Sequence, residues 1–224
     1  MNKSQLVKMA AGRFVLGVLV FLAIFFLPAG TFNYWYAWVY MGVLFLPLVF
    51  VFSYLLKNNP DLLERRMRTN EREKKQQLFV LMSGILITLA YVLPGFDFRL
   101  GWSQVPVWVA LLADLVVLAG YGFVFLVFRE NRYTSRVVEV ETEQTVISTG
   151  PYGIVRHPMY LGMVAMYVFS PLALGSYWAM IPAVLIIPAL MFRLLDEEKV
   201  LARDLPGYTE YMKKVKFHLF PGIW

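Results

Sequence analysis

The sequence predicts an all-α fold, a polytopic transmembrane helical bundle with about six membrane segments. Of its 224 residues, 59% are hydrophobic and only 16% are charged, whereas soluble domains average about 25% charged residues. Long apolar stretches recur along the chain, and the cations gather between alternate pairs of them. A soluble core does not need this much apolar surface, so lipid is the expected surrounding of the helices.

Six apolar stretches are candidates for membrane segments, at residues 14–27, 35–56, 78–93, 107–127, 160–174 and 177–195. A spanning helix needs about 20 residues, with roughly 17–25 tolerated. The second, fourth and sixth stretches meet this length, whereas the other three are short. The third is expected to stop at Pro94. The last two stretches are close in sequence and predict a helical hairpin, although their length leaves open whether they cross the bilayer fully.

The distribution of cations predicts the orientation. Twenty of the twenty-one Lys and Arg residues fall in four regions that alternating spans place on one side, and only Arg99 falls on the other. The positive-inside rule makes the cation-rich side cytoplasmic, together with both termini. The basic loop at residues 57–75 is expected mainly to fix this topology, with attraction to anionic lipid headgroups as the alternative. The net charge of +6 therefore needs no nucleic-acid partner.

Composition also restricts the possible chemistry. The chain has no cysteine and only two histidines, His157 and His218. Disulfides, thiolate nucleophiles and cysteine-zinc sites are thereby excluded, and an all-histidine metal site is not expected. Asp114 lies midway along the fourth stretch, where an acid should face protein or water rather than lipid. A functional role and a hydrogen-bonded contact between helices are both open for it.

The chain divides into two regions by composition. Residues 1–128 hold the first four helices, and residues 129–224 hold a polar connector, the helical hairpin and a C-terminal tail. Within the connector, Val137, Val138 and Val140 alternate with acidic residues in a partly strand-like pattern. The connector is too polar to cross a membrane, so it is expected on the cytoplasmic face.

The connector leads into a motif at residues 150–162, in which Gly150-Pro151 and Gly153 predict turns. Pro158 suits the first turn of a helix because its missing N–H would be unpaired there. His157 then lies near the N-cap, where free N–H groups favour an anionic ligand group. The alternative for Arg156 and His157 is an interfacial anchor at the start of a membrane helix.

A second cluster follows the sixth stretch. Arg193 and Glu197 are four residues apart and share one helix face. This spacing is also typical of a surface ion pair. Pro206-Gly207 is expected to break the chain before Tyr208 and Tyr211.

Taken together, residues 143–221 resemble the isoprenylcysteine carboxyl methyltransferase family, which includes phospholipid methyltransferase-like members. The resemblance rests on Gly-x-Tyr-x-x-x-Arg-His-Pro-x-Tyr-x-Gly at residues 150–162, on Arg-x-x-x-Glu-Glu at residues 193–198, and on Gly-Tyr-x-x-Tyr at residues 207–211. Family members often have Phe-Gly before the tail tyrosines, where this chain has Pro206-Gly207.

The resemblance implies an S-adenosylmethionine cofactor enclosed by the cytoplasmic ends of the last helices and the tail. It assigns Glu197 to the cofactor amino group and Arg193, as the catalytic candidate, to the substrate. The remaining residues that it assigns to the cofactor pocket are Gln144, Thr145, Val146, Ile147, Tyr152, His157, Pro158, Met159 and Tyr160.

The acceptor implied by the family name is a lipophilic carboxylate such as that of isoprenylcysteine, reached from the membrane. Phospholipid amines and small thiols are alternative acceptors. An NADPH-dependent enzyme related to sterol reductases and a non-enzymatic transporter or scaffold are alternatives of other classes. The expected partners are the bilayer and a lipophilic or lipidated substrate, and the oligomeric state is left open.

Overall fold

The computed structural model describes residues 3–66, 74–134 and 144–224, and these residues form helices without any strand. The helices are α1 (Lys3–Ala29), α2 (Trp35–Asn58), α3 (Pro60–Arg66), α4 (Lys74–Leu100), α5 (Val107–Glu130), the short 3-10 helix η1 (Gly150–Gly153), α6 (Pro158–Ala173), α7 (Met180–Asp204) and α8 (Tyr208–Lys214). The predicted all-α fold is confirmed.

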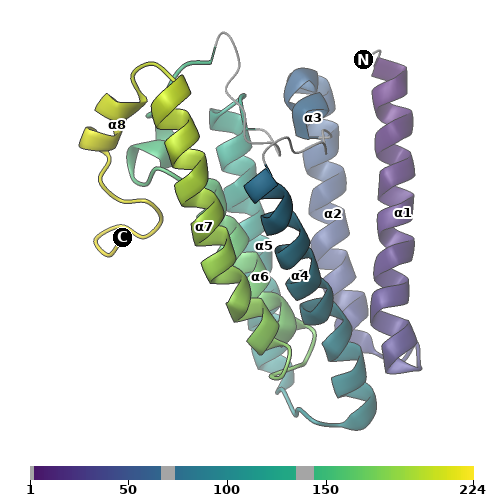
Figure 1. The fold of residues 1–224 in the computed structure, drawn as a ribbon. Coiled ribbons are helices and arrows are strands. Elements are labelled where there is room, and N and C mark those ends of the chain that lie inside the picture. The colour runs from purple at the N-terminus through teal and green to yellow at the C-terminus, as the bar shows by residue number, and fades with distance from the viewer. Residues whose placement is uncertain (1–2, 67–73, 135–143) are drawn as a thin grey trace.

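The long helices lie side by side in one bundle (Figure 1). Helix α5 packs along α6, and α4 packs between α1 and α7. The short helices α3 and α8 lie at the end of the bundle where α7 finishes (Figure 1). The N-terminus starts at the same end, so the polar segments and both short helices gather there.

Among the described residues, four helices are long and apolar enough to cross a membrane, namely α1, α2, α4 and α5, which makes the chain an integral membrane protein. Helix α6 is apolar but has only 16 residues. Helix α7 has 25 residues, but its last third carries both acids and cations. Full crossing by the last two helices therefore remains a prediction.

One predicted boundary is wrong. Helix α4 does not stop at Pro94 but runs on to Leu100. Membrane helices tolerate proline where neighbouring groups compensate for the lost hydrogen bond. Two contacts hold the additional turn. A Cβ at Gly95 would lie 2.8 Å from the carbonyl oxygen of Phe25, so glycine permits close approach to α1. Asp97, 1% exposed, accepts hydrogen bonds from the hydroxyls of Ser103 and Ser176.

The core between the long helices is mostly aromatic and aliphatic, with Phe25, Tyr34 and Val117 fully buried. The Tyr40 hydroxyl forms hydrogen bonds with the hydroxyls of Tyr91 and Ser170 in the same core. Asp114 is also buried, yet neither of its carboxylate oxygens has a hydrogen-bond partner in the described part of the chain. The hydrogen-bonded contact considered for Asp114 is therefore not what the structure shows.

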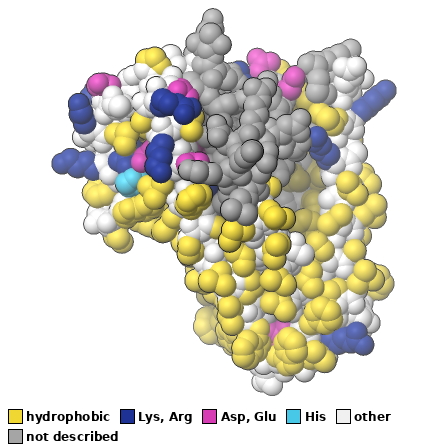
Figure 2. Space-filling model, in the orientation of Figure 1, with side chains coloured by type: hydrophobic (Ala, Val, Ile, Leu, Met, Phe, Trp, Pro, Cys, Tyr) yellow, Lys and Arg dark blue, Asp and Glu magenta, His cyan; other side chains and the backbone are white. Residues whose placement is uncertain are grey.

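Charge and hydrophobicity separate along the bundle. Figure 2 shows Lys and Arg side chains gathered at the end that carries α8, and hydrophobic side chains over most of the remaining face. Exposed hydrophobic side chains occur along all four candidate spans, among them Leu19, Phe50, Leu81 and Leu115. This surface suits a lipid environment.

Candidate functional site

A cavity of about 580 Å³ opens at the polar end of the bundle. Its walls come from α3, α4, the connector, η1, α6, α7 and α8. One part is apolar and lies between α4, α6 and α7, where Ile87, Met163 and Leu190 line it. The other part is polar and lies against the Gly150–Gly162 motif and α8. The cavity therefore joins a polar chamber to the apolar interior of the bundle.

The structure brings almost all predicted site residues together around this cavity. The lining includes Gln144, Thr145, Val146, Ile147, Tyr152, His157, Met159, Tyr160, Arg193 and Glu197. Pro158 does not line it and is buried in the first turn of α6. In the connector, residues 144–147 are neither helix nor strand, and the predicted valine alternation lies mostly at residues 135–143, outside the described residues.

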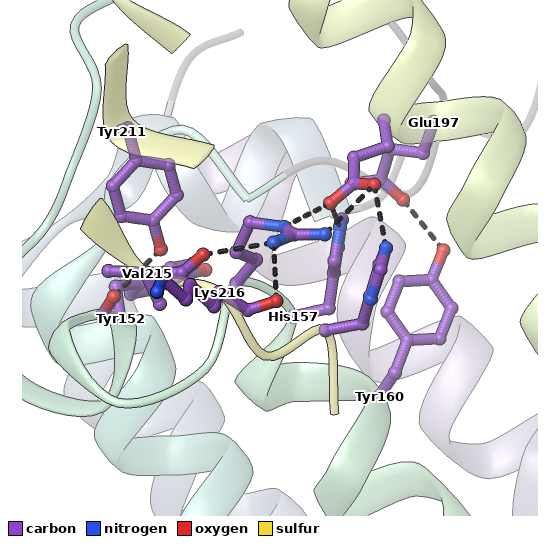
Figure 3. Close-up of polar contacts among 10 residues, drawn as sticks. Tyr152, His157, Tyr160, Glu197, Tyr211, Val215 and Lys216 are labelled. Carbon is purple, nitrogen blue, oxygen red and sulfur yellow. Dashed lines mark hydrogen bonds and ion pairs between the residues drawn. The ribbon is translucent and has the colours of Figure 1, made fainter. Parts of the chain in front are cut away.

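Turns shape the motif as its glycines and prolines predict. Gly150 has a φ of +56°, which favours glycine, and Pro151 follows at the start of η1. Tyr152 is thereby turned inward. Its hydroxyl accepts a hydrogen bond from Asn131 at 3.0 Å, and its carbonyl accepts one from the Tyr211 hydroxyl at 2.7 Å. Burial is the main cause that raises the pKa of Tyr152, which keeps this phenol neutral. Figure 3 shows Tyr211 pointing toward Tyr152.

His157 is the N-cap of α6 and Pro158 begins the helix, as predicted. Arg156 and His157 are 6% and 5% exposed, so they are not an interfacial anchor at the membrane surface. One carboxylate contacts both side chains and compensates the buried charge of Arg156. Arg156 forms an ion pair with Glu198, and the His157 Nε2 lies 3.3 Å from the same carboxylate.

Glu198, to which sequence reasoning assigned no role, contacts both Arg156 and His157. Burial alone would raise the pKa of its carboxyl, but hydrogen bonds from His157 and Arg156 lower that pKa to about 2. Glu198 therefore stays ionised at neutral pH. Two adjacent glutamates look alike in the sequence, and the available signal was the arginine inside the motif, which needs a counter-charge once it is buried.

Glu197 and Arg193 lie on the cavity side of α7. The Tyr160 hydroxyl donates to the Glu197 carboxylate at 2.7 Å (Figure 3), and Arg193 lies beside the same hydroxyl. The arrangement places a cation and an anion at one polar wall of the cavity. Glu197 is thus engaged with α6 as well as sharing a helix face with Arg193.

The tail closes one side of the cavity. The predicted break lies between α7 and α8, where Gly207 has a φ of +83°. Tyr208 and Tyr211 of α8 both line the cavity and are 4% exposed. The Tyr208 hydroxyl has no hydrogen-bond partner among the described residues. Burial raises its pKa, with the nearby acids Glu198 and Glu197 adding to the effect.

Several lining residues come from helices without any sequence motif. Arg66 of α3 and Val80, Ser83 and Gly84 of α4 belong to the first 128 residues. Sequence reasoning assigned the cavity to the C-terminal region alone. The packing of α4 against α7 brings the α4 residues to the site, and Arg66 reaches it from α3, where its guanidinium donates to the Met159 sulfur at 3.7 Å.

The cavity walls and the motif agree with a comparison to known families. Residues 108–205 match the family model described as phospholipid methyltransferase. This part of the chain is similar to that methyltransferase family. The methyltransferase match begins in α5 and ends just after α7, so it covers the motif, Arg193, Glu197 and Glu198. The walls from α3, α4 and α8 lie outside it. A search of the curated proteins found no match.

Proposed function

We propose that this membrane methyltransferase transfers a methyl group from S-adenosylmethionine to a lipophilic acceptor that enters from the bilayer, a carboxylate such as that of isoprenylcysteine. One observation carries the proposal. All of the residues predicted to hold the cofactor except Pro158, together with the predicted substrate residue Arg193, line a single cavity that continues into an apolar space between α4, α6 and α7.

The cavity fits the cofactor in size and chemistry. Its volume of about 580 Å³ lies within the roughly 300–1,000 Å³ typical of sites for ligands of this size. Glu197 would hold the cofactor amino group, since a carboxylate forms strong charge-assisted hydrogen bonds with an ammonium. Tyr152, Met159 and Tyr160 supply the aromatic and apolar surfaces that an adenine ring and a methionine chain need.

S-adenosylmethionine, when bound, supplies a methyl group on a positively charged sulfur. The protein then has to align an acceptor oxygen with that methyl group, and such positioning can contribute about 7–11 kcal/mol to catalysis. Arg193 can hold a carboxylate through two parallel hydrogen bonds. A carboxylate is already a nucleophile at neutral pH, so Arg193 only needs to orient it and no general base is required.

A phospholipid amine is the second candidate acceptor, because the matched family is described as phospholipid methyltransferase. An ammonium must lose a proton before it can accept a methyl group. Asp114 does not line the cavity, so it would not take this proton. Small thiols remain a third acceptor class. The family match favours methyl transfer over the reductase and the transporter.

We place the cavity and both termini on the cytoplasmic side. The support is the excess of cations at the end of the bundle that carries the cavity (Figure 2). Cysteine-scanning with a membrane-impermeant reagent can test this, since the chain has no native cysteine. A cysteine introduced at the exposed Lys214 should react only when the cytoplasmic face is accessible.

Cofactor binding is the first test of function. Calorimetry on the purified protein in detergent should detect S-adenosylmethionine binding and no NADPH binding, and the reverse result would refute the proposal. Labelled S-adenosylmethionine should then transfer its methyl group to an isoprenylated cysteine, with phospholipids and small thiols as comparison acceptors.

Two variants separate the proposed roles. Arg193→Ala should abolish transfer while largely sparing cofactor binding, because Arg193 is assigned to the acceptor. Glu197→Ala should weaken cofactor binding, by about tenfold or more for a lost hydrogen-bonded charge worth roughly 1.5–3 kcal/mol. Full activity of Arg193→Ala would overturn the assignment of Arg193.

A further inference from the structure

Helix α8 covers the cavity and is held at both of its ends. Its first residue follows α7 after a short turn at Gly207. Its last residue, Lys214, leads into the tail at residues 215–224. Because Tyr208 and Tyr211 line the cavity from this helix, the attachment of the tail determines whether that wall of the cavity is in place.

The tail is attached to the motif by four hydrogen bonds. The Arg156 guanidinium donates to the carbonyl oxygens of Val215 at 2.9 Å and Lys216 at 2.8 Å. The backbone N–H groups of Arg156 and His157 donate to the carbonyl oxygens of Phe217 and His218, each at 2.9 Å. Figure 3 shows Val215 and Lys216 beside His157. The motif and the tail therefore form one unit.

Glu198 joins this unit to α7. Its carboxylate forms the ion pair with Arg156, and it lies 3.1 Å from the Nε2 of His218 in the tail. The His218 ring also stacks on Trp224, with 4.4 Å between the ring centroids. Glu198 itself does not line the cavity. It is 6% exposed, so removing its charge would leave the Arg156 guanidinium buried without a counter-charge.

We propose that Glu198 is a positioning residue, which keeps α8 closed over the cavity by holding Arg156 and His218 together. The proposal rests on the proposed function, in that the cavity is taken as the cofactor site. With α8 released, Tyr208 and Tyr211 leave the wall and Tyr152 loses its hydrogen bond from Tyr211. Cofactor affinity then falls in proportion to the fraction of molecules that are closed.

The test compares Glu198→Gln with the unchanged protein in full-length form. S-adenosylhomocysteine affinity is measured by calorimetry, and amide hydrogen exchange is followed along the whole chain. We expect about tenfold or greater loss of affinity, together with faster exchange confined to residues 156–157 and 208–224. In transfer assays with labelled S-adenosylmethionine and a membrane lipid extract, the KM for the cofactor should rise, while kcat at saturating cofactor stays within about twofold.

Three further variants sharpen the result. Glu197→Gln should lower affinity without changing exchange in the tail, because Glu197 bonds to Tyr160 and not to the tail. Asp204→Asn removes an exposed pair with Arg203 and should change neither measurement. His218→Ala removes the contact with Glu198 and the stack on Trp224 but keeps Arg156 paired. It should shift both measurements in the same direction as Glu198→Gln but less, so it serves if Glu198→Gln does not fold.

The outcomes distinguish this proposal from the function on which it rests. Unchanged affinity and unchanged tail exchange in Glu198→Gln or His218→Ala would overturn the positioning role. A lowered kcat with unchanged KM would also overturn it, since it would assign Glu198 to the chemical step. Failure of the unchanged protein to bind S-adenosylhomocysteine would instead overturn the proposed function.

Discussion

Replacing Gly162 with alanine should disturb the site through the packing of α6 on α5. A Cβ at Gly162 would lie 2.6 Å from the Val124 Cγ2 and 3.0 Å from the carbonyl oxygen of Gly120. Ordinary contacts begin at 3.4 Å, so the two helices must separate by about 0.4–0.8 Å. Overpacking of this kind costs about 1–3 kcal/mol.

The displacement reaches the cavity because Tyr160 is two residues before Gly162 on the same helix. A misplacement near 1 Å can lower a rate by about 10²-fold. We therefore expect Gly162→Ala to lower both the melting temperature in detergent and the rate of methyl transfer. The matched control is Gly122→Ala on α5, where a Cβ meets nothing within 4 Å. If Gly162→Ala behaves like Gly122→Ala in both assays, the close approach of the two helices does not position the site.

Further predictions concern the tail and its dependence on pH. Tyr211→Phe removes the 2.7 Å hydrogen bond to the Tyr152 carbonyl and should cost about 1 kcal/mol in tail docking. Tyr208→Phe should cost nothing, because the Tyr208 hydroxyl has no partner among the described residues. Hydrogen exchange in the tail can compare the two variants. Burial lowers the pKa of His218 in the docked tail, so the released tail takes up a proton at a higher pH than the docked tail does. Tail docking should therefore weaken as the pH falls below about 6.5. A pH series of tail exchange should show this weakening in the unchanged protein and not in His218→Gln. The pKa of Glu198 is lowered from 4.5 to about 2, so its ionised carboxylate contributes roughly 3 kcal/mol to the free energy of unfolding. This contribution should be complete above pH 4.5 and lost progressively toward pH 2. Acid unfolding of Glu198→Gln should lack this pH-dependent loss.

Most of the helical architecture could be predicted from hydropathy, because each long apolar stretch must pair its own backbone groups in lipid. The boundary at Pro94 could not, since the contacts of Gly95 and Asp97 that keep the helix going come from other parts of the chain. Proline locally disfavours continuation of a helix, but here the tertiary contacts outweigh that effect.

The candidate site was predictable where it follows the motif and hidden where it depends on packing. The residues at 144–160 that line the cavity follow one another along the chain, and Arg193 and Glu197 share a helix face. Arg66 and the α4 residues carry no local pattern that points to a ligand. The pairing of Arg156 with Glu198 joins positions 42 residues apart, and no periodicity marks it. The tail partner of Glu198, His218, lies beyond the break at Gly207, where no local pattern links the two.

The hydrogen bonds of Asp97 at the opposite end of the bundle have a consequence for access to the cavity. They tie the last turn of α4 to Ser176, in the connection between α6 and α7. Ile87 on the cavity wall lies about 15 Å from this tie along α4, at about 1.5 Å per residue. These hydrogen bonds fix α4 relative to α7 at the end of the bundle far from the cavity opening. If a lipid chain enters between the two helices, they would separate least at this fixed end and most near Arg193 and Glu197.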